Sequence, residues 1–428
     1  MSVPDPSDAA DQVDVAIVGG GLVGASLAVA LAPLGLKVAL VESTAADAER
    51  QPSFDDRTTA LGNGSRQVFE SLGLWDTLAP QAAPIRRIHV SDAGRFGFAR
   101  LEAPALDLDA FGFVLTNRVL GAALRERLAA LPGLELRMPA RCTAVTLRSD
   151  CVELTTDPGE RPLRARLAVA ADGAGSSLRA AAGLEASTED YRQVAIVAHV
   201  LASQPSDGTA YERFTPQGPF AVLPLAGGAW GVVWTLAPAD AERMLALPDA
   251  EYLAELQRAF GWRAGRFLKV GTRNAYPLKL VRAAAVTGAR VALVGNAAQG
   301  LHPVAGQGFN LGLRDVATLA EILSDALRAT PRVDGTDDAG TRVDVGAPAV
   351  LAQYAARRVS DRDGMVRFTD GLVKLFGDER PGVPWARDLG LLLFDLSPTA
   401  KRALSRLSWG FGGRTPRLAR GAGPAADA

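Results

Sequence analysis

The apolar pattern at the start of the chain predicts a strand, a helix and a second strand. Val13–Val18 is a short apolar run of the kind that forms a buried strand. Leu22–Leu34 is rich in small and apolar residues and ends at Gly35, a residue type common directly after helices. Lys37–Val41 is a second apolar strand. Together they occupy about thirty residues, the length of a βαβ unit.

Further along the chain, apolar residues recur at helical spacing in some segments and alternate in others. Arg118–Leu131 carries leucines at helical spacing, whereas Ala195–Leu236 is rich in β-formers and aromatic residues, with Gly227–Gly228 as a hairpin turn. Because α/β patterns lie on both sides of this β-rich block, we expect one discontinuous nucleotide-binding domain with a second domain inserted. The other expected elements are helices over Asn63–Trp75, Asp249–Phe260, Leu311–Ala329 and Ala349–Phe376, strands within Ile85–Leu101, around Cys142 and Cys151, and over Leu167–Ala171 and Arg290–Val294, and a loop over Thr330–Pro348.

An uncharged run, Val15–Leu36, is 22 residues long and could cross a bilayer. Two features oppose a membrane span or a signal peptide. Aspartates dominate the segment before the run, where a signal peptide carries positive charge. Gly19–Gly21 interrupts the run, and the apolar pattern changes its period there. We therefore expect neither a signal nor a span in this segment.

The composition argues against several classes of protein. The chain has 428 residues, with 46 Lys and Arg against 47 Asp and Glu, and a net charge of −1 argues against nucleic-acid binding by bulk electrostatics. Cys142 and Cys151 are predicted to be free thiols of a reducing cytoplasm. The three histidines are scattered, so we expect no metal site. The chain also lacks GxxxxGK[ST], GxSxG and HExxH motifs.

The first motif that carries chemistry is Gly19-x-Gly21-x-x-Gly24, between the first strand and the first helix. Such glycines allow a tight turn, the approach of a pyrophosphate, and close packing of helix on strand. Glu42 ends the second strand 21 residues after Gly21, where a carboxylate can accept hydrogen bonds from a ribose. The motif predicts a dinucleotide and does not separate FAD from NAD.

The second motif is Asp172-Gly173, which follows the strand over Leu167–Ala171 and precedes a helix start. A carboxylate there can hold a ribityl or pyrophosphate group. The alternative is that Asp172 or Ser176 caps the helix.

The third and most specific segment is Gly295–Asp315, which reads GNAAQGLHPVAGQGFNLGLRD. It follows an apolar strand and runs into a helix. Its glycines let the backbone pass close to a flat ring, and the N–H groups at the start of the helix favour negative charge, such as that on a reduced flavin.

In this order and spacing, the three motifs resemble those of flavoprotein aromatic hydroxylases of the para-hydroxybenzoate hydroxylase type. Asp55–Leu61 and the wording of Gly295–Asp315 are similar to the ubiquinone-biosynthesis branch of that family, and most of all to its 2-octaprenyl-6-methoxyphenol hydroxylases. The family's usual Gly-Asp pair is Gly295-Asn296 here, a departure that also occurs in the ubiquinone branch. The resemblance covers nearly the whole chain.

This resemblance implies an α/β (α+β) fold with three parts. A discontinuous Rossmann-like FAD-binding domain is expected over residues 12–84, 112–182 and 277–330. An inserted β-sheet substrate domain is expected over 85–111 and 183–276, and C-terminal helices over 349–428.

The resemblance also assigns roles around FAD, with NAD(P)H as the reductant. It implies that Gly19, Gly21, Gly24 and Glu42 hold the ADP half, that Arg57 and Arg118 reach the phosphates or ribityl chain, and that Asp172 touches both FAD and the pyridine nucleotide. It implies that Gly295 and Asn296 meet the ribityl chain, and that Pro303, Gly306, Gln307, Gly308, Phe309 and Asn310 line the isoalloxazine.

Other residues have a structural interpretation beside the functional one. Arg57 could form a surface ion pair, and His302 is a weak candidate base that could instead shape the turn before Pro303. Phe220, Leu223, Pro224 and Trp234 could form a substrate-facing wall or pack in a core. Tyr354, Arg357 and Arg358 are expected on a solvated helix face.

The expected function is an FAD- and NAD(P)H-dependent monooxygenase that hydroxylates the ring of a polyprenyl phenol in ubiquinone biosynthesis, with O2, through a hydroperoxide on the flavin. The alternatives are a flavin-dependent reductase or dehydrogenase of a prenyl lipid, and a flavin-bound assembly subunit. Expected partners are the phenol and O2, a membrane surface and other enzymes of ubiquinone biosynthesis. We expect a cytoplasmic protein, peripheral on the inner membrane.

The basic C-terminal segment offers a route to the membrane. Lys401, Arg402, Arg406, Arg414, Arg417 and Arg420 are interspersed with Leu404, Leu407, Trp409 and Phe411. Such a mixture suits an interface with anionic lipid or with a partner enzyme. The alternative is a C-terminal helix packed on the flavin domain.

Overall fold

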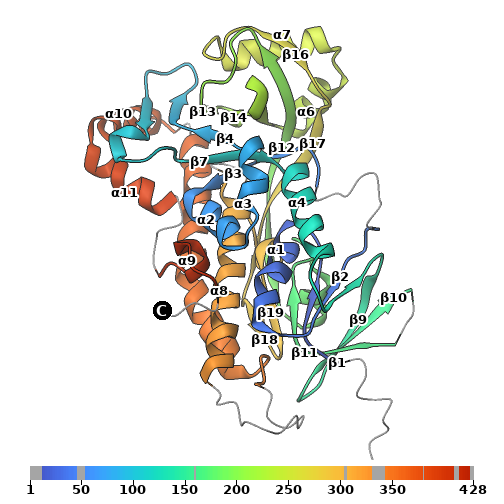
Figure 1. Cartoon of the computed structure of the whole chain (residues 1–428). Coiled ribbons are helices and arrows are strands. Elements are labelled where there is room, and N and C mark those ends of the chain that lie inside the picture. Colours follow the sequence, from blue (N-terminus) through green and yellow to red (C-terminus); the bar gives the residue numbers. More distant parts are fainter. Residues whose placement is uncertain are drawn as a thin grey trace, which may run out of the picture.

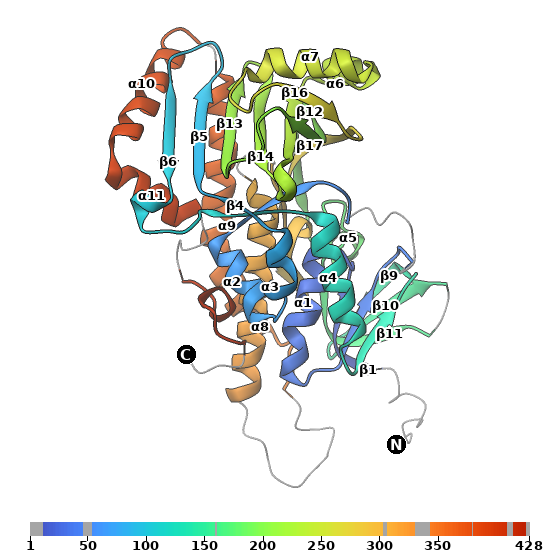
Figure 2. The same cartoon turned by 45° about the horizontal axis from the view of Figure 1, so that its top comes forward.

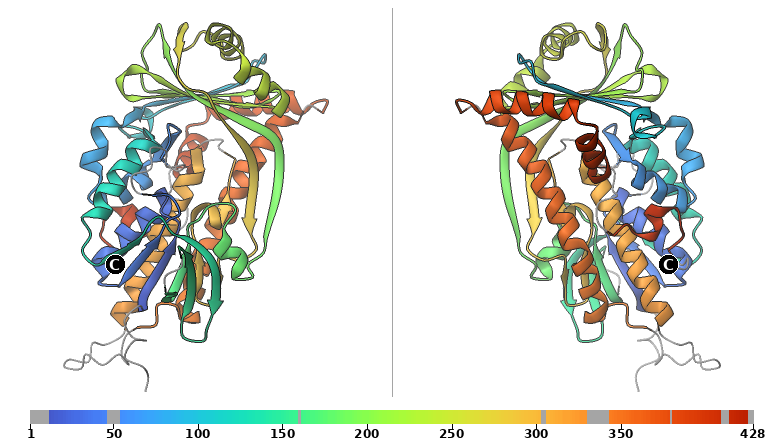
Figure 3. Two further views of the ribbon diagram at one scale, coloured as in Figure 1. Left: turned by 90° about the vertical axis from the view of Figure 1, so that its right-hand side faces the viewer. Right: turned by 90° about the vertical axis from the view of Figure 1, so that its left-hand side faces the viewer.

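The computed structural model describes residues 12–45, 54–158, 161–302, 306–329, 343–378, 380–408 and 414–424. Two large sheets carry the fold, one in each half of the molecule (Figure 1). Helix α9 runs alongside both halves, whereas α8 lies beside the first sheet (Figures 1 and 3). None of the described helices combines the length and the apolar character that a bilayer-spanning helix needs.

The first sheet has the order β18-β19-β11-β1-β2-β8, in which β19 to β8 are parallel and β18 is antiparallel to β19, and the hairpin β9–β10 is attached to β11. Helices α1 (Leu22–Leu31), α4 (Asn117–Ala129) and α8 (Gln307–Ala329) pack together beside it. The strands are β1 (Gln12–Val18), β2 (Val38–Val41), β8 (Leu134–Arg137), β9 (Arg141–Leu147), β10 (Val152–Asp157), β11 (Leu163–Ala170), β18 (Thr287–Gly288) and β19 (Val291–Leu293).

The predicted strand–helix–strand unit is confirmed, and the uncharged run Val15–Leu36 lies within it. β1 pairs in parallel with β2 and with β11, so its side chains are buried on both faces. A short 3₁₀ turn follows α1, and Gly35 then adopts a left-handed conformation with φ of 69°, as expected of a residue after a helix.

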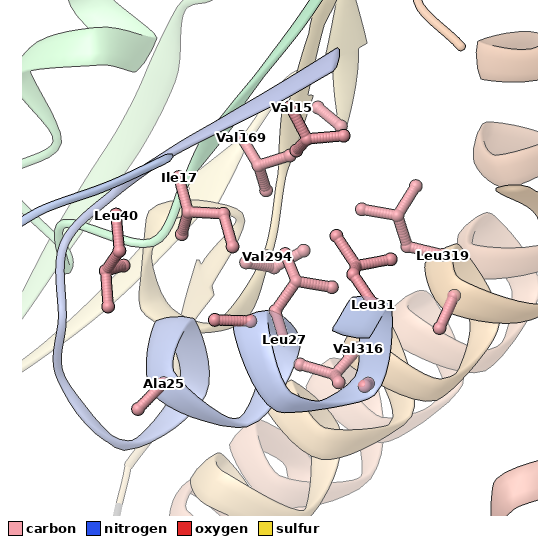
Figure 4. Packing of buried hydrophobic residues seen from close by; sticks show 14 of the residues in the cluster. Val15, Ile17, Ala25, Leu27, Leu31, Leu40, Val169, Val294, Val316 and Leu319 are labelled. Atoms are coloured by element: carbon pink, nitrogen blue, oxygen red, sulfur yellow. The ribbon is translucent and has the colours of Figure 1, made fainter. Parts of the chain in front are cut away.

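The main hydrophobic core lies between this sheet and its helices (Figure 4). Leu27 and Leu31 of α1 point toward Val294 and toward Val316 of α8 (Figure 4). Full burial of each such side chain is worth about 1.5–3 kcal/mol. This packing fixes α1 relative to α8.

A small sheet and two helices lie between the two halves. The sheet has the order β3-β7-β4, and helix α2 follows β3 directly. The elements are β3 (Thr58–Gly62), α2 (Asn63–Ser71), α3 (Trp75–Leu78), β4 (Ala83–Ile85) and β7 (Gly112–Thr116).

The second sheet has the order β20-β17-β12-β15-β14-β13-β5-β6, with β16 paired to β12. Helices α6 (Pro238–Ala246) and α7 (Asp249–Phe260) cover the face that points away from the first sheet (Figure 2). The strands are β5 (Arg87–Asp92), β6 (Phe98–Glu102), β12 (Ala186–Ala202), β13 (Thr209–Thr215), β14 (Gly218–Pro224), β15 (Trp230–Leu236), β16 (Phe267–Val270), β17 (Asn274–Ala283) and β20 (Gln299–Gly300).

Three helices follow the described end of α8. Helix α9 (Pro348–Gly377) packs along α8, and α10 (Val383–Leu396) packs on the edge strand β6. Helix α11 (Pro398–Ser408) continues from α10 (Figure 2). The remaining short helix is α5 (Ser177–Ala181). Most of the segment predicted as a loop, residues 330–342, lies outside the described residues.

The prediction of a solvated face for Tyr354, Arg357 and Arg358 is wrong. Tyr354 is fully buried, and its hydroxyl donates to the Leu293 carbonyl at 2.8 Å. Arg358 is buried too, and its Nε donates to Asp315 Oδ1 at 2.6 Å. Arg357 pairs with Glu321 of α8 at 2.8 Å. The sequence pattern did not show this because each charge has its partner on α8, far away in the chain.

Arg358 and Asp315 belong to a buried network between α8 and α9. Asp361, one turn after Arg358, pairs with both Arg358 and Arg314. Asp315 also accepts hydrogen bonds from the backbone N–H of Gly295 and from the side-chain amide of Gln299, both at 2.8 Å. The network therefore ties two helices to the loop after β19.

The end of the basic C-terminal segment, Arg417–Arg420, packs on α8, so the alternative of a packed C-terminus holds for this part of it. The N–H of Arg417 donates to Glu321 at 2.6 Å, and its Nη2 donates to Asp325 at 2.6 Å. Leu418 and Ala419 are buried in the main core. The proposal of Arg417 as a membrane contact is therefore wrong, while Trp409 and Phe411 lie outside the described residues.

We expect Arg358→Leu to lower the free energy of unfolding by about 3–5 kcal/mol, because it leaves the carboxylate of Asp315 buried without its cation. Chemical denaturation of the flavin-saturated protein measures the change. The control is Arg243→Leu, which removes an exposed partner of Asp240 and should cost less than about 1 kcal/mol. Equal denaturation midpoints for the two variants would contradict the importance of the network.

Candidate active site

One large cavity, of about 1330 Å³, lies between the two sheets. Its floor includes Val18, Val41 and Ala171, where the parallel strands β1, β2 and β11 end. Ligands of open α/β sheets bind at this edge. Its roof is formed by the second sheet, and α9 and α10 close one side. The cavity therefore joins a dinucleotide-type cleft to a second chamber.

The glycine motif takes the geometry that a dinucleotide needs. Gly19 has φ of +104°, and a Cβ there would lie 2.5 Å from the Ala171 carbonyl oxygen. A Cβ on Gly24 would lie 1.9 Å from the Gly19 oxygen, so Gly24 permits the contact between α1 and the strand end. Gly21 is the N-cap of α1 and lines the cavity, which places the N-terminus of this helix beside it.

Glu42 is buried at the end of β2 and lines the cavity. Its Oε2 accepts from the N–H of Gly20 at 2.6 Å, and its Oε1 accepts from the N–H of Thr44 at 2.8 Å. The carboxylate is thus held against the glycine turn. That it also accepts from a ribose remains a prediction.

One carboxylate oxygen of Asp172 caps the start of α5, and the other has no hydrogen-bond partner among the described residues. Its Oδ2 accepts from the N–H of Ser177 at 2.8 Å and from that residue's hydroxyl at 3.1 Å, at the start of α5. Its Oδ1 is buried and has no hydrogen-bond partner among the described residues, although Asp172 lines the cavity. A buried carboxylate oxygen without a donor fits a ligand that supplies one.

The start of α8 lines the cavity through Gly306, Gln307, Gly308, Phe309 and Asn310. Asn310 is held by four hydrogen bonds. Its oxygen accepts from the N–H of Gly62 at 2.9 Å and from the Ser65 hydroxyl at 2.6 Å, and its amide donates to the carbonyls of Ala60 and Gly306. Asn310 thus fixes the start of α8 against β3 and α2.

The two residues of the Gly295-Asn296 pair have different roles. Gly295 is buried with φ of +58°, and a Cβ there would lie 3.0 Å from Val23. It is not among the residues that line the cavity, whereas the exposed Asn296 is. The N–H of Gly295 donates to Asp315, so this glycine holds the loop that presents Asn296.

The two predicted arginines lie in different surroundings. Arg57 lines the cavity, pairs with Asp55 at 2.8 Å and lies over the ring of Tyr276 at 4.7 Å. Arg118 pairs with Asp56 at 2.8 Å, is exposed, and is not among the residues that line the cavity. Contacts of either arginine with FAD remain predictions.

His302 lies apart from the cavity lining. It is buried against the edge of Tyr191, and its Nε2 lies 3.3 Å from Gln193 Oε1. Burial lowers its pKa to about 4, so its ring is neutral at pH 7. This environment favours the interpretation of His302 as a packing residue. Pro303 lies outside the described residues.

Of the predicted substrate wall, Leu223 lines the cavity and Phe220 does not. Phe220 stacks on Trp234, with ring centroids 5.3 Å apart, in the core under α6 and α7. Pro224 is also absent from the lining. The reason is the period of two in β14, which points alternate side chains to opposite faces of the sheet.

The sequence reading missed two groups of lining residues. Glu212 of β13 lines the chamber, as do apolar residues of α9 and α10, which are Phe368, Leu372, Leu375, Phe376, Val383, Ala386, Gly390, Leu391 and Phe394. Alternation along β13 could have placed Glu212 on the same face as Ala210 and Phe214. Nothing in the local pattern of α9 and α10 shows which sheet they pack against.

These residues fit a bound dinucleotide. Gly173, Gly175 and Gly308 all line the cavity, and a Cβ on any of them would meet no heavy atom within 4 Å. Their backbones therefore face open space beside the orphaned oxygen of Asp172 and the N-terminus of α1. The fold and the site define a dinucleotide-binding protein whose cleft adjoins a second chamber.

Comparison with known proteins agrees. A family model described as an FAD binding domain matches residues 12–350, and the chain belongs to this family, whose cofactor is FAD. The chain is similar to ubiquinone hydroxylase UbiL of Rhodospirillum rubrum, with 41% identity over 96% of this chain and 94% of the relative. It is also similar to 3-demethoxyubiquinol 3-hydroxylase of Escherichia coli, with 32% identity over 93% and 98% of the two chains.

The solved structure of p-nitrophenol 4-monooxygenase PnpA from Pseudomonas putida DLL-E4 shares the fold. The TM-score is 0.75 at 21% sequence identity, over 93% of this chain and 99% of that one. The chain is thus an FAD-dependent monooxygenase by family, with an α/β fold of the aromatic-hydroxylase type.

We expect Gly21→Val to abolish flavin binding and leave the chain folded. Gly21 has φ of −65°, which valine adopts readily, but its side chain would enter the space that the pyrophosphate needs. The measurement is flavin absorbance per mole of purified protein, with circular dichroism as the folding check. Wild type should be yellow and release free FAD on heating, and normal FAD content in the variant would contradict the placement of the cofactor.

Proposed function

We propose that this monooxygenase hydroxylates the aromatic ring of a polyprenyl phenol in ubiquinone biosynthesis. In the balanced reaction, the phenol, O2, NAD(P)H and a proton give the hydroxylated phenol, water and NAD(P)⁺. One oxygen atom enters the ring and the other becomes water. The names of the relatives, which are ubiquinone hydroxylases, support this assignment.

The observation that carries the proposal is the continuity of the cavity. Phe309 and Asn310 at the flavin-type cleft line the same cavity as Leu223 of the second sheet and Phe394 of α10. A mostly apolar chamber beside the cleft suits an apolar substrate with a reactive ring. A long prenyl chain could extend between the sheet and the C-terminal helices.

The chain's own residues bind, orient and exclude water. The N-terminus of α1 and the orphaned oxygen of Asp172 suit the phosphate and hydroxyl groups of the cofactor. Asn310 holds the start of α8, whose N–H groups favour negative charge beside them. The apolar chamber keeps water from the ring. Bound FAD supplies the redox chemistry, because it accepts two electrons from NAD(P)H and activates O2.

Turnover under ¹⁸O2 with a short-chain prenyl phenol tests the reaction, with product and water analysed by mass spectrometry. We expect one labelled atom in each hydroxylated product molecule. A product reduced or dehydrogenated without label would instead indicate a flavin reductase or dehydrogenase. If FAD is bound but neither a product nor NAD(P)H oxidation is detected, the result would favour an assembly subunit.

Because a polyprenyl phenol resides in the bilayer, we propose that the enzyme works at the membrane surface and that α10 makes the contact. Trp385, Leu389, Leu393 and Leu396 are exposed and follow one face of this helix at helical spacing. Phe96 of the β5–β6 turn lies beside Trp385, with ring centroids 5.4 Å apart. Together these five residues form an exposed apolar strip, which we call the α10 face.

The opposite side of α10 explains why a lipid surface suits this face. Leu391 and Phe394 line the substrate chamber, so one helix separates the chamber from the α10 face. Helix α11 follows with the exposed Arg402, whose charge suits anionic lipid. The contact thus shifts from the basic C-terminal segment to the helix before it.

We expect Leu389→Glu with Leu393→Glu to weaken co-sedimentation with phosphatidylglycerol vesicles about tenfold or more, because each buried leucine contributes about 1.5–3 kcal/mol. The control is Leu268→Glu on β16, since Leu268 is 56% exposed and Leu389 is 55% exposed. FAD content should not change in either variant. Equal vesicle binding by both variants, or none by wild type, would contradict a membrane role and leave a partner enzyme as the occupant.

A further inference from the structure

We propose that Glu212 is the polar anchor of the substrate chamber, where its carboxyl group hydrogen-bonds the ring hydroxyl of the phenol. This inference rests on the proposed function and adds a residue that recognises the substrate. Two observations carry it: the position of Glu212 in the second sheet, and a buried oxygen that has no hydrogen-bond partner among the described residues.

The surroundings of Glu212 in the sheet are apolar on every side. Glu212 lies opposite Val90 of β5 and opposite Ala221 of β14. On its own strand, Ala210 and Phe214 point to the same face. All four neighbours line the chamber together with Glu212. A buried carboxyl group without a hydrogen bond costs free energy, and an apolar patch offers it none. A ligand that hydrogen-bonds the group would remove this cost.

No described residue gives the buried oxygen of Glu212 a hydrogen bond. Its Oε1 is buried and unpartnered. This desolvation raises the pKa of Glu212 to about 8, well above its ordinary value of 4.5. At pH 7 the group therefore carries its proton, and it can donate a hydrogen bond to a phenol oxygen as well as accept one.

One charged pair at the chamber, Arg387 with Asp92, is already occupied. Arg387 of α10 lines the chamber, but its Nε donates to Asp92 of β5 at 2.8 Å and its Nη1 donates to the carbonyls of Leu375 and Phe376. Strand β14 has no titratable side chain. Arg387 and Asp92 thus neutralise one another.

The other titratable groups around the chamber also have partners or stay neutral. Lys374 of α9 pairs with Asp370 at 2.8 Å, and Arg213 of β13 donates to the Ala259 carbonyl at 3.1 Å. Burial lowers the pKa of His89 on β5, whose ring lies between Phe98 and Tyr211. Asp388 of α10 is buried but is not among the lining residues. These groups leave Glu212 to interact with the substrate.

The geometry explains what the anchor accomplishes. A prenyl phenol offers a polar oxygen on one side of its ring and an apolar tail on the other. An apolar chamber alone would let the ring slide and rotate, whereas a single hydrogen bond fixes its register relative to the cleft. A site built to bond a hydroxyl also rejects analogues that lack it, because its own polar group is then unpaired.

The experiment compares wild type, Glu212→Gln and Glu212→Leu, with Glu102→Leu on the exposed part of β6 as the control. The probes are a monoprenyl phenol and its O-methyl ether. Calorimetry with the oxidised holoenzyme measures binding without turnover, and product formed per NAD(P)H oxidised measures coupling. FAD content and melting temperature report folding.

We expect Glu212→Leu to weaken binding of the phenol about 10- to 100-fold and to lower coupling, while binding of the methyl ether changes little. Glu212→Gln keeps a donor and an acceptor, and its affinity for the phenol should stay within about threefold of wild type at pH 7.

The KM of wild type should rise as the pH passes about 8, because the ionised carboxylate must give up its water when the substrate enters. The KM of the Gln variant should stay level over the same range.

Two results would overturn the inference. One is phenol binding by Glu212→Leu equal to that of Glu102→Leu, and the other is retained discrimination against the methyl ether. Failure of the proposed function would look different. Wild type would then put no labelled oxygen into the probe, while calorimetry would still show whether Glu212 holds the phenol.

Discussion

The buried carboxylate of Asp315 is the interaction on which the rest of the site depends. It accepts from the N–H of Gly295, from the amide of Gln299 and from Arg358, so three segments meet at one side chain. A buried carboxylate is stable only with such donors. The loop that carries Asn296, the helix whose start lines the cleft, and α9 are therefore placed together. Satisfying this charge positions the cofactor side of the cavity.

Most charged side chains around the cavity follow the same rule as Asp315, because they too have partners within the protein. Most ionic groups near the cavity are used inside the protein, as Arg387 is by Asp92 and Arg57 by Asp55. The groups left for ligands are mainly backbone N–H groups, glycines and apolar side chains, together with the unpartnered oxygens of Asp172 and Glu212. Such a site suits a flavin that binds through its phosphates and hydroxyls beside an apolar chamber. In that setting a single unpaired carboxyl group on β13 has a large effect on which ring is bound.

The local sequence pattern was enough to predict the helices and strands around the first motif. It could not predict which residues pair with partners far away along the chain. The βαβ unit followed from the apolar runs and Gly35, and helix α7 begins and ends at the predicted residues. The sequence left Phe220 open between the substrate wall and a core, because side chains of β14 alternate between two faces and only the pairing of strands shows which face meets the chamber. Arg358 and Arg417 look solvated in sequence, since their acidic partners lie 43 and 92 residues away along the chain.

Helix α10 connects access, binding and chemistry in one element. Its inner side completes the chamber, its outer side is apolar and exposed, and Arg387 in its first half anchors it to Asp92 of β5. A helix held by a buried ion pair can present both sides without moving as a rigid lid. The prenyl chain of a membrane-resident phenol would then need to pass only the thickness of one helix between bilayer and chamber. The ring and the prenyl tail are the two ends of this substrate. The hydroxyl anchor, Glu212, would therefore act on the ring, while the α10 face would act at the membrane, where the tail resides.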